Sequence, residues 1–332
     1  MLDDGRVVSQ DQRAGGQVER ILHLKQLPII GTLPAADLAL VADRMRERFF
    51  RKGEWLTREG EPVRAFYTVL DGTLHVSRGG KTMGHTRSDG VVGGFAILGR
   101  DPRGLSVRAE EDSLTLEVEA GAINEILEEN FGVTHHVLRE ISRQLIALLA
   151  RQKNPWAQVP VPPDPKMARP RELDLVERIL FMRQMAPFRR ASINALAELS
   201  RGLTEVRLEP GTTLWNAGDP AGWVSLVVSG EVTCSTVDGV PQHLHAGAPL
   251  GSLEATAEAP RWYSAVTRTP VTALNGPIDG LVDVFEDNFE MAMDYMAFMA
   301  RWLMDTFEGQ DYGDAALAKL FGCEADPVDV AG

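Results

Sequence analysis

The sequence predicts an α+β, mainly β protein made of two tandem copies of one barrel, each flanked by N- and C-terminal helices. Three observations lead to this fold class. The chain matches itself without a gap when it is shifted by 158 residues. Each copy begins and ends with apolar residues at helical spacing. Between these ends, short apolar runs alternate with glycine and proline, which is typical of antiparallel strands joined by tight turns.

The repeat aligns residues 18–145 with residues 176–303. Of the 128 paired positions, 27 are identical, whereas unrelated chains of ordinary composition share roughly one position in fifteen. The run Val-Glu-Arg-Ile-Leu opens both copies, and Pro-Arg-x-x-Ser recurs late in each copy, at Arg103 and Arg261. Because solenoid repeats have periods of about 20 to 50 residues, this much longer period indicates a duplicated domain.

The elements of the first copy are expected in a fixed order. A short helix is predicted in residues 15–27 and a second helix in residues 34–48. Short strands follow from residue 55 to about residue 118, and one long closing helix is predicted over residues 122–152. Apolar residues on one face predict the second helix: Leu38, Val41, Ala42 and Met45. Glycines that recur in both copies are expected at turns with positive φ: Gly53, Gly60, Gly72, Gly211, Gly218 and Gly230.

The domain organisation follows from the repeat and from one proline-rich segment. Residues 154–170 contain six prolines, which favour an extended, semi-rigid spacer. The predicted parts are a flexible N-terminal tail (1–17), a first domain (18–153), this linker (154–170), a second domain (171–308) and an acidic C-terminal tail (309–332).

Charge and composition exclude several classes of function. The net charge is −13, and from Asp279 onward 13 acidic residues stand against only Arg301 and Lys319. Nucleic-acid binding depends on cationic contacts to phosphate, so no nucleic-acid partner is expected. No apolar run reaches the roughly 18 to 20 residues that cross a bilayer, and no apolar leader opens the chain, so no membrane contact is expected. The only two cysteines, Cys234 and Cys323, predict reduced thiols in a cytoplasmic protein.

Motifs for catalysis and metal binding are missing from the sequence. No phosphate-binding glycine loop, nucleophile elbow or His-Glu-x-x-His motif occurs. We therefore expect no enzymatic activity, no catalytic residue, no metal and no cofactor. His243 and His245 lie on one face of a predicted strand, but no carboxylate follows within a few residues to complete a metal site. A histidine pair at the surface or at the edge of the core is expected instead.

One stretch, VGGFAILGRDPRGLSVRA (residues 92–109), resembles the phosphate-binding cassette of the cyclic nucleotide-binding domain. That domain occurs in catabolite activator proteins and in the regulatory subunit of cAMP-dependent protein kinase. The resemblance implies two tandem jelly-roll barrels. It also implies a short helix whose first amides face a cyclic phosphate, an arginine that pairs with the phosphate and a glutamate that binds the ribose. In the first domain it places ligand contacts at Gly93, Gly94, Phe95, Ala96, Arg103, Gly104, Leu105 and Ser106.

Both copies depart from the family pattern at the glutamate, which is replaced by Gly94 and by Ser252. Losing a charge-assisted hydrogen bond costs roughly 1.5 to 3 kcal/mol, so the first domain is expected to bind a cyclic nucleotide weakly, or another anion. In the second domain Trp262 and Tyr263 follow Arg261, where the family has small residues, and their rings are expected to fill the pocket. The implied degenerate site comprises Gly251, Ser252, Leu253, Arg261, Trp262 and Tyr263. The alternative for both arginines is a scaffold role, in which they pair with a carboxylate or cap strand carbonyls.

The second closing helix, residues 281–307, is apolar on nearly every side from Met291 onward. Such a helix must be buried all round, against the first domain, a second copy of the chain or another protein. The candidate interface residues are Phe289, Met293, Met296, Met299, Trp302 and Leu303.

The segment after this helix is short and acidic and shows no helix-turn-helix, so a transcription-factor role is not expected. We expect a non-catalytic regulatory protein that senses a cyclic nucleotide through the first domain and passes the signal to a protein partner. The alternative is a ligand-free scaffold, an adaptor or an oligomeric structural protein that uses the methionine-rich helix.

Overall fold

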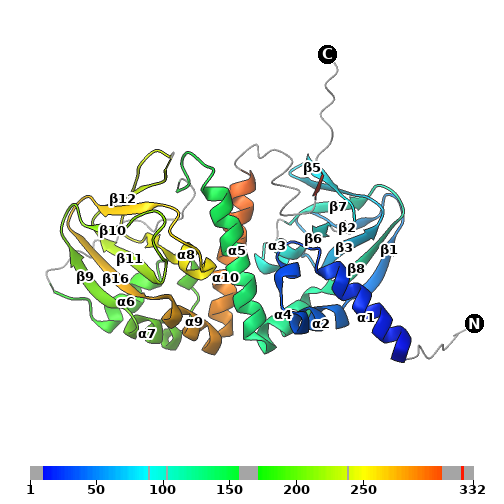
Figure 1. Cartoon of the computed structure of the whole chain (residues 1–332), viewed down its shortest axis with the longest axis horizontal. Helices are drawn as coiled ribbons and strands as arrows, with labels where there is room; N and C mark the ends of the chain where they lie inside the picture. The colour runs from blue at the N-terminus through cyan, green and yellow to red at the C-terminus, as the bar shows by residue number, and fades with distance from the viewer. Residues whose placement is uncertain are drawn as a thin grey trace, which may run out of the picture. The chain divides into compact units, whose positions relative to one another are not determined.

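The computed structural model describes residues 10–88, 90–101, 104–156, 171–237, 239–308 and 323–324. The helices and strands of these residues fall into two compact units (Figure 1). The first unit comprises Met1–Val133 with Tyr312–Gly332, and the second comprises Thr134–Asp311.

The first unit is a barrel of two antiparallel sheets. Its strands are β1 (Arg46–Phe50), β2 (Trp55–Thr57), β3 (Ala65–Asp71), β4 (Leu74–Arg78), β5 (Lys81–Thr86), β6 (Val91–Val92), β7 (Ser106–Ala109), β8 (Ser113–Glu119) and β17 (Cys323–Glu324). The strand orders are β1-β8-β3-β6 and β17-β5-β4-β7-β2. The flanking helices are α1 (Gln10–Leu24), η1 (Ile30–Thr32), α2 (Ala35–Asp43), α3 (Gly94–Leu98), α4 (Ala120–Glu129) and the start of α5 (Phe131–Leu149).

The second unit repeats this architecture. Its strands are β9 (Thr204–Leu208), β10 (Thr213–Trp215), β11 (Trp223–Ser229), β12 (Val232–Ser235), β13 (Gln242–Leu244), β14 (Pro249–Leu250), β15 (Ser264–Thr267) and β16 (Val271–Pro277). Its helices are α6 (Leu175–Met182), η2 (Ala186–Phe188), α7 (Ile193–Arg201), α8 (Ser252–Ala257), α9 (Ile278–Asp287) and α10 (Phe289–Glu308). The orders β14-β11-β16-β9 and β10-β15-β12-β13 match those of the first barrel, except that β17 of the first barrel has no counterpart among the described strands. The predicted pair of jelly-roll barrels is confirmed.

The core of each barrel lies between its two sheets, because successive strand residues point to opposite faces. In the first barrel Phe66 pairs with Val118 across β3 and β8, and both side chains are buried. In the second barrel Val227 pairs with Ala273 across β11 and β16, and both belong to the buried cluster that includes Cys234 and Tyr263.

The recurring glycines lie at positive φ, as predicted. The clearest pair is Gly72 and Gly230, with φ of 95° and 91°. A Cβ on Gly72 would lie 2.7 Å from the Cα of Ser113, and one on Gly230 would overlap the carbonyl oxygen of Pro270. Both the backbone conformation and the close approach therefore require glycine.

Two predicted helix boundaries differ from the structure. The first helix begins at Gln10, so residues 10–17 are helical rather than part of a tail. The second predicted helix ends at Asp43, and Arg46–Phe50 form β1 because they pair with β8 instead. Met45 is still buried, 2% exposed, just beyond the end of that helix.

Each predicted closing helix is two helices with a break at an asparagine. Asn130 has φ −133° and ψ 84°, and Asn288 has φ −134° and ψ 74°. The Asn130 side chain donates to the carbonyl of Ile126 (3.1 Å), and the Asn288 side chain donates to that of Val284 (3.0 Å). Each asparagine therefore caps the preceding helix, which accounts for its identity in both copies.

Replacing Gly280 with alanine is expected to stabilise the second unit by about 0.5 to 1 kcal/mol. Gly280 lies in α9, and a Cβ there would meet no atom within 4 Å. Alanine loses less backbone entropy than glycine when a helix forms. Chemical denaturation measures the change. Gly276→Ala is the control, because its Cβ would lie 2.6 Å from Cδ2 of Leu203 and should destabilise; equal effects of the two substitutions would contradict the prediction.

Candidate functional site

The first barrel carries a glycine-lined turn and a short helix at the predicted cassette. Gly93 precedes α3 with φ 90°, and a Cβ there would lie 2.7 Å from the carbonyl oxygen of Ala65. Gly104, at the far end of the cassette, has φ 55°. A Cβ on Gly93 would lie 3.3 Å from one γ-methyl group of Val63, and a Cβ on Gly104 would lie 3.2 Å from the other. The fold therefore brings both ends of the cassette together around one side chain.

The other predicted contacts of the first cassette are divided between core and surface. Phe95, Ala96 and Leu105 are buried. Ser106 accepts a hydrogen bond from the amide of Glu59 (3.0 Å). A Cβ on Gly94 would lie 3.9 Å from its nearest neighbouring atom, so a side chain would fit there. Arg103 and its neighbour Pro102 lie outside the described residues.

A buried ion pair holds the first cassette and was not predicted from the sequence. Nη2 of Arg78 on β4 lies 3.6 Å from Oδ2 of Asp101, and the two side chains are 9% and 5% exposed. The amide of Asp101 also donates to the carbonyl of Ala96 (3.0 Å). The second copy has Thr236 and Ala259 at these positions, so only the first cassette has this pair.

In the second copy the side chain of the cassette arginine points into the protein interior. Arg261 is 4% exposed. Its Nη1 donates to the carbonyl of Gly251 (3.0 Å) and its Nη2 to that of Trp223 (2.5 Å). The guanidinium carbon lies 4.0 Å from the centroid of the Trp215 ring. The guanidinium thus caps main-chain carbonyls and stacks on an indole.

The two rings after Arg261 pack into the barrel. Tyr263 is 3% exposed, and its hydroxyl accepts the amide hydrogen of Gly251 (3.0 Å), at the start of α8. The Trp262 ring lies 5.1 Å from the Tyr263 ring. Trp156 stacks on Trp262 with ring centroids 5.4 Å apart and planes 19° apart. Sequence reasoning missed Trp156 because it stands among the prolines of the predicted linker.

The short helix of the second cassette, α8, carries a buried carboxyl group. Glu254 on α8 is 1% exposed, and burial raises its pKa from 4.5 to about 7, although the nearby positive charge of Arg261 opposes that rise. Its Oε1 has no hydrogen-bond partner among the described residues. Burial and the Glu254 charge also raise the pKa of the Cys234 thiol. Sequence reasoning missed Glu254 because acidic residues are usually exposed on short helices.

The closing helix of the first copy contacts the second cassette. From Thr134 onward α5 belongs to the second unit. Arg143 donates from Nε to the carbonyl of Ala257 (2.9 Å), and Arg139 pairs with Glu258 (3.3 Å). Glu258 ends α8 in the left-handed conformation, with φ 50°. The end of α8 is therefore held by a helix that begins in the first copy.

Five of the six candidate interface residues on α10 are buried within the single chain. Met293, Met296, Met299 and Leu303 are at most 1% exposed, Trp302 is 9% exposed, and Phe289 is half-buried. The chain itself thus supplies the apolar side chains that the sequence predicts around this helix. Apart from Phe289, these side chains present almost no surface to another protein in this conformation.

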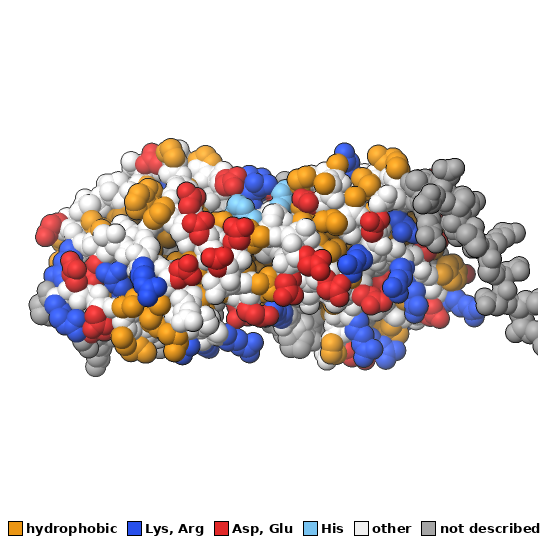
Figure 2. All heavy atoms as spheres, turned by 90° about the horizontal axis from the view of Figure 1, so that it is seen from below, with side chains coloured by type: hydrophobic (Ala, Val, Ile, Leu, Met, Phe, Trp, Pro, Cys, Tyr) orange, Lys and Arg blue, Asp and Glu red, His pale blue; other side chains and the backbone are white. Residues whose placement is uncertain are grey.

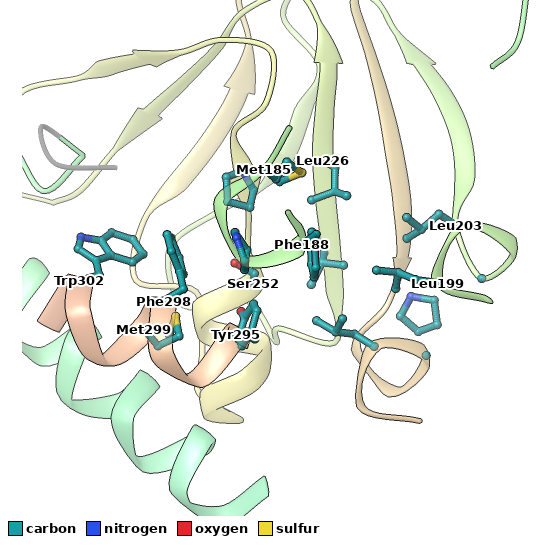
Figure 3. A pocket seen from close by; sticks show the side chains of 17 residues that line it. Met185, Phe188, Leu199, Leu203, Leu226, Ser252, Tyr295, Phe298, Met299 and Trp302 are labelled. Atoms are coloured by element: carbon teal, nitrogen blue, oxygen red, sulfur yellow. The ribbon is translucent and has the colours of Figure 1, made fainter. Parts of the chain in front are cut away.

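Part of α10 lines an apolar pocket of the second unit, with a volume of about 40 Å³ (Figure 3). Met185, Phe188, Leu226 and Phe298 contribute to its wall. Tyr295 on α10 and Ser252 on α8 point toward one another in Figure 3. Burial raises the pKa of Tyr295, and the Thr256 and Ser252 side chains partly oppose that rise. The start of α8 therefore faces α10.

The described residues contain no cluster of three or more His, Cys, Asp or Glu side chains that could hold a metal ion. No helix in the described part of the chain has the length and hydropathy to cross a membrane. On the face in Figure 2, acidic side chains are numerous and basic side chains occur in separate small groups, so the described residues visible there form no continuous basic stripe.

Comparisons with known proteins agree with this architecture. Residues 47–130 and 205–288, together just over half of the chain, match the family model described as Cyclic nucleotide-binding domain. A segment of 92 residues is 36% identical to the cGMP-dependent protein kinase egl-4 of Caenorhabditis briggsae, covering 28% of this chain and 12% of that kinase. A segment of 92 residues is 30% identical to a cAMP-dependent protein kinase regulatory subunit of Emericella nidulans, covering 27% of this chain and 22% of that subunit.

The chain therefore spans less than a quarter of the length of these two relatives. Among solved structures, the regulatory subunit of a cAMP-independent protein kinase A from Trypanosoma brucei matches with 16% sequence identity and a TM-score of 0.34. That match covers 91% of this chain and 92% of the other.

Proposed function

The chain belongs to the cyclic nucleotide-binding domain family, with one such domain in each half, and we propose that it is a non-catalytic regulatory protein in which only the first domain senses a ligand. The proposed ligand is a cyclic nucleotide, bound weakly through the cassette around Gly93 and Arg103. The second domain is proposed to bind no nucleotide and to transmit the state of the first.

The observation that carries this proposal is the difference between the two cassettes. In the second, the protein's own groups take up the binding functions: Arg261 donates to carbonyls, and the amide of Gly251 donates to Tyr263. A phosphate there would have to displace all of these bonds. In the first cassette Gly104 stands where the second copy has Trp262, and a side chain at Gly94 would have room.

The proposed route of transmission is α5. This helix starts in the first unit and continues into the second, where Arg143 and Arg139 hold the end of α8. A ligand that repositions α5 in the first domain would therefore pull on α8. Because Ser252 on α8 and Tyr295 on α10 face one another in the wall of the same pocket (Figure 3), the same movement would reach α10, from which we propose that a protein partner reads it.

Replacing Gly94 with glutamate is expected to tighten cyclic nucleotide binding about 10- to 150-fold, because it restores a charge-assisted hydrogen bond of roughly 1.5 to 3 kcal/mol. Calorimetric titration with cAMP, cGMP and cyclic dinucleotides measures the change. Gly94→Ala, which adds a Cβ without the acid, is the matched control. Adding Arg103→Ala to Gly94→Glu should remove the gain, whereas Arg108→Ala, on an exposed part of the same barrel, should not.

Equal affinities of the Gly94→Glu and Gly94→Ala variants for every nucleotide would overturn the proposed ligand site. The same titration separates the second candidate, a ligand-free scaffold, which is favoured by the missing side chain at Gly94. If the chain is a scaffold, millimolar nucleotide should give no binding heat with the wild-type chain, although the Gly94→Glu variant binds it. For a sensor, the wild-type chain binds weakly and Arg103→Ala abolishes that binding.

A further inference from the structure

A strand from the C-terminal segment pairs with the edge of one sheet in the first barrel. β17 contains only Cys323 and Glu324 and runs antiparallel to β5, with Cys323 opposite Thr86 and Glu324 opposite His85 (Figure 1, the short red strand beside β5). Among the described strands, β5 has only one other neighbour, β4. β17 therefore lies on the side of β5 where an edge strand presents unpaired backbone groups.

The edge of β5 is suited to strand addition, whereas the matching edge of the second barrel is not. β5 spans six residues, Lys81–Thr86, without a proline. Its counterpart β13 spans three residues, Gln242–Leu244, and directly follows Pro241. Short strands and proline protect a sheet edge, because proline has no N–H to donate. No strand in the described part of the chain adds to the outer side of β13.

The two paired segments have opposite charge. Residues 81–87, which comprise β5 and the residue after it, contain two cationic residues, Lys81 and Arg87, one histidine and no acidic residue. Residues 323–332 contain three acidic residues and no Lys or Arg. Opposite charges on neighbouring strands favour pairing, and like charges oppose it. The corresponding residues of the second copy, 239–245, contain no Lys or Arg, so this complementarity is confined to the first barrel.

The first barrel holds β5 in place without β17. β5 pairs with β4 from Lys81 to Thr86, whereas β17 pairs with only the last two of these residues. The His85 ring, which lies opposite Glu324 in the register, is held from the barrel side. It lies 5.3 Å from the His75 ring between centroids, and its Nε2 lies 3.0 Å from Oε1 of Glu110. The edge is therefore preformed, and β17 can leave it without unfolding β5.

We propose that the outer edge of β5 is a docking site for an extended, acidic peptide segment, and that the chain's own segment from Cys323 onward occupies this site in the resting state. In strand addition, main-chain hydrogen bonds supply affinity and side chains supply specificity, here for acidic residues. A tethered segment has a high effective concentration, so a peptide of a partner protein has to displace it. The site is separate from the cassette and does not depend on whether the first domain binds a nucleotide.

The test measures binding of a fluorescent peptide with the sequence of residues 321–330 to the full-length chain, under reducing conditions. A full-length variant that combines Cys323→Pro with Glu324→Pro, which we call the open-edge variant, has no main-chain N–H at either position to pair with β5. We expect it to bind the peptide at least tenfold more tightly than the wild-type chain does. The same peptide with Gln and Asn in place of its Glu and Asp residues should bind more weakly.

The charge requirement is tested on the barrel by adding Lys81→Glu and Arg87→Glu to the open-edge variant, which should lower the peptide affinity at least tenfold. Arg46→Glu is the matched control, because Arg46 lies on β1, an edge strand of the other sheet, with its side chain 78% exposed; it should leave the affinity unchanged. Equal peptide binding by the wild-type chain and the open-edge variant, or no binding by either, would overturn the proposal. Equal affinities for the acidic and amide peptides would refute the acidic specificity.

A cross-link tests the pairing even if the open-edge variant does not fold. Because Cys323 lies opposite Thr86, full-length Thr86→Cys should form a disulfide with Cys323 within one chain on treatment with oxidised glutathione. The remaining cysteine, Cys234, is buried. Leu244→Cys is the matched control, because Leu244 has the position of Thr86 in the second barrel, and it should form no such link. A disulfide between two chains, or none with Thr86→Cys, would show that the chain's own segment does not occupy the edge.

Discussion

Replacing Arg261 with alanine is expected to lower the free energy of unfolding of the second unit by about 3 to 5 kcal/mol, the usual loss when one partner of a buried charged group is removed. The carbonyls of Gly251 and Trp223 would lose their donor. The buried Glu254 would also lose the nearby positive charge that favours its ionised form. Denaturant unfolding followed by tryptophan fluorescence measures the change, because only Trp55 of the six tryptophans lies outside the second unit.

The matched control for this prediction is Arg268→Ala. Arg268 pairs with Glu231 at 3.1 Å, but its side chain is 54% exposed, and exposed pairs contribute about 0 to 1 kcal/mol. Arg261→Lys keeps the charge but not the planar fork, so we expect an intermediate loss. An Arg261→Ala variant as stable as Arg268→Ala would show that the buried guanidinium does not hold the second cassette.

Glu254 is expected to make the second unit more stable at acid pH. Its pKa in the folded chain is about 7, above its ordinary value of 4.5, so the folded state binds the proton more tightly than the unfolded state does. The stabilisation is complete below pH 4.5 and is lost as the pH rises to about 7. The loss amounts to about 3 kcal/mol. Denaturant unfolding at several pH values between 4.5 and 8 measures this slope.

Glu254→Gln, which cannot ionise, should flatten this pH dependence and should be more stable than the wild-type chain at pH 8. Glu258→Gln serves as the control, because the Glu258 side chain is 53% exposed and its removal should leave the slope in place. A wild-type slope that persists in Glu254→Gln would assign the pH dependence to other groups.

The sequence predicted the architecture because the duplication records it twice. Positions such as Gly72 and Gly230 are identical because the backbone has positive φ at this turn in each copy. The corresponding strands of the two copies also pair in the same order and register. The break of each closing helix was missed, although Asn130 and Asn288 are also identical. An asparagine is tolerated inside a helix, and only its bond to the carbonyl four residues earlier shows it to be a cap.

The candidate site was less predictable because its contacts join segments that are distant in the chain. The rings of Trp262 and Tyr263 were predicted to fill a pocket, and both pack into or against the core of the second barrel. Nothing in the spacing of residues connects them to Trp156, more than 100 residues earlier. Likewise, no local pattern pairs Arg78 with Asp101 or places Glu254 out of water.

Because most of α5 belongs to the second unit, the second domain is not complete on its own. A second domain that began at its own first helix, α6, would contain nothing to hold the last turn of α8 or to cover Trp262. Here the helix and the tryptophan that do so are encoded by the end of the preceding copy. The second half thus depends on residues encoded with the first, and a gene cut between the two would leave the end of α8 and the Trp262 ring without these contacts.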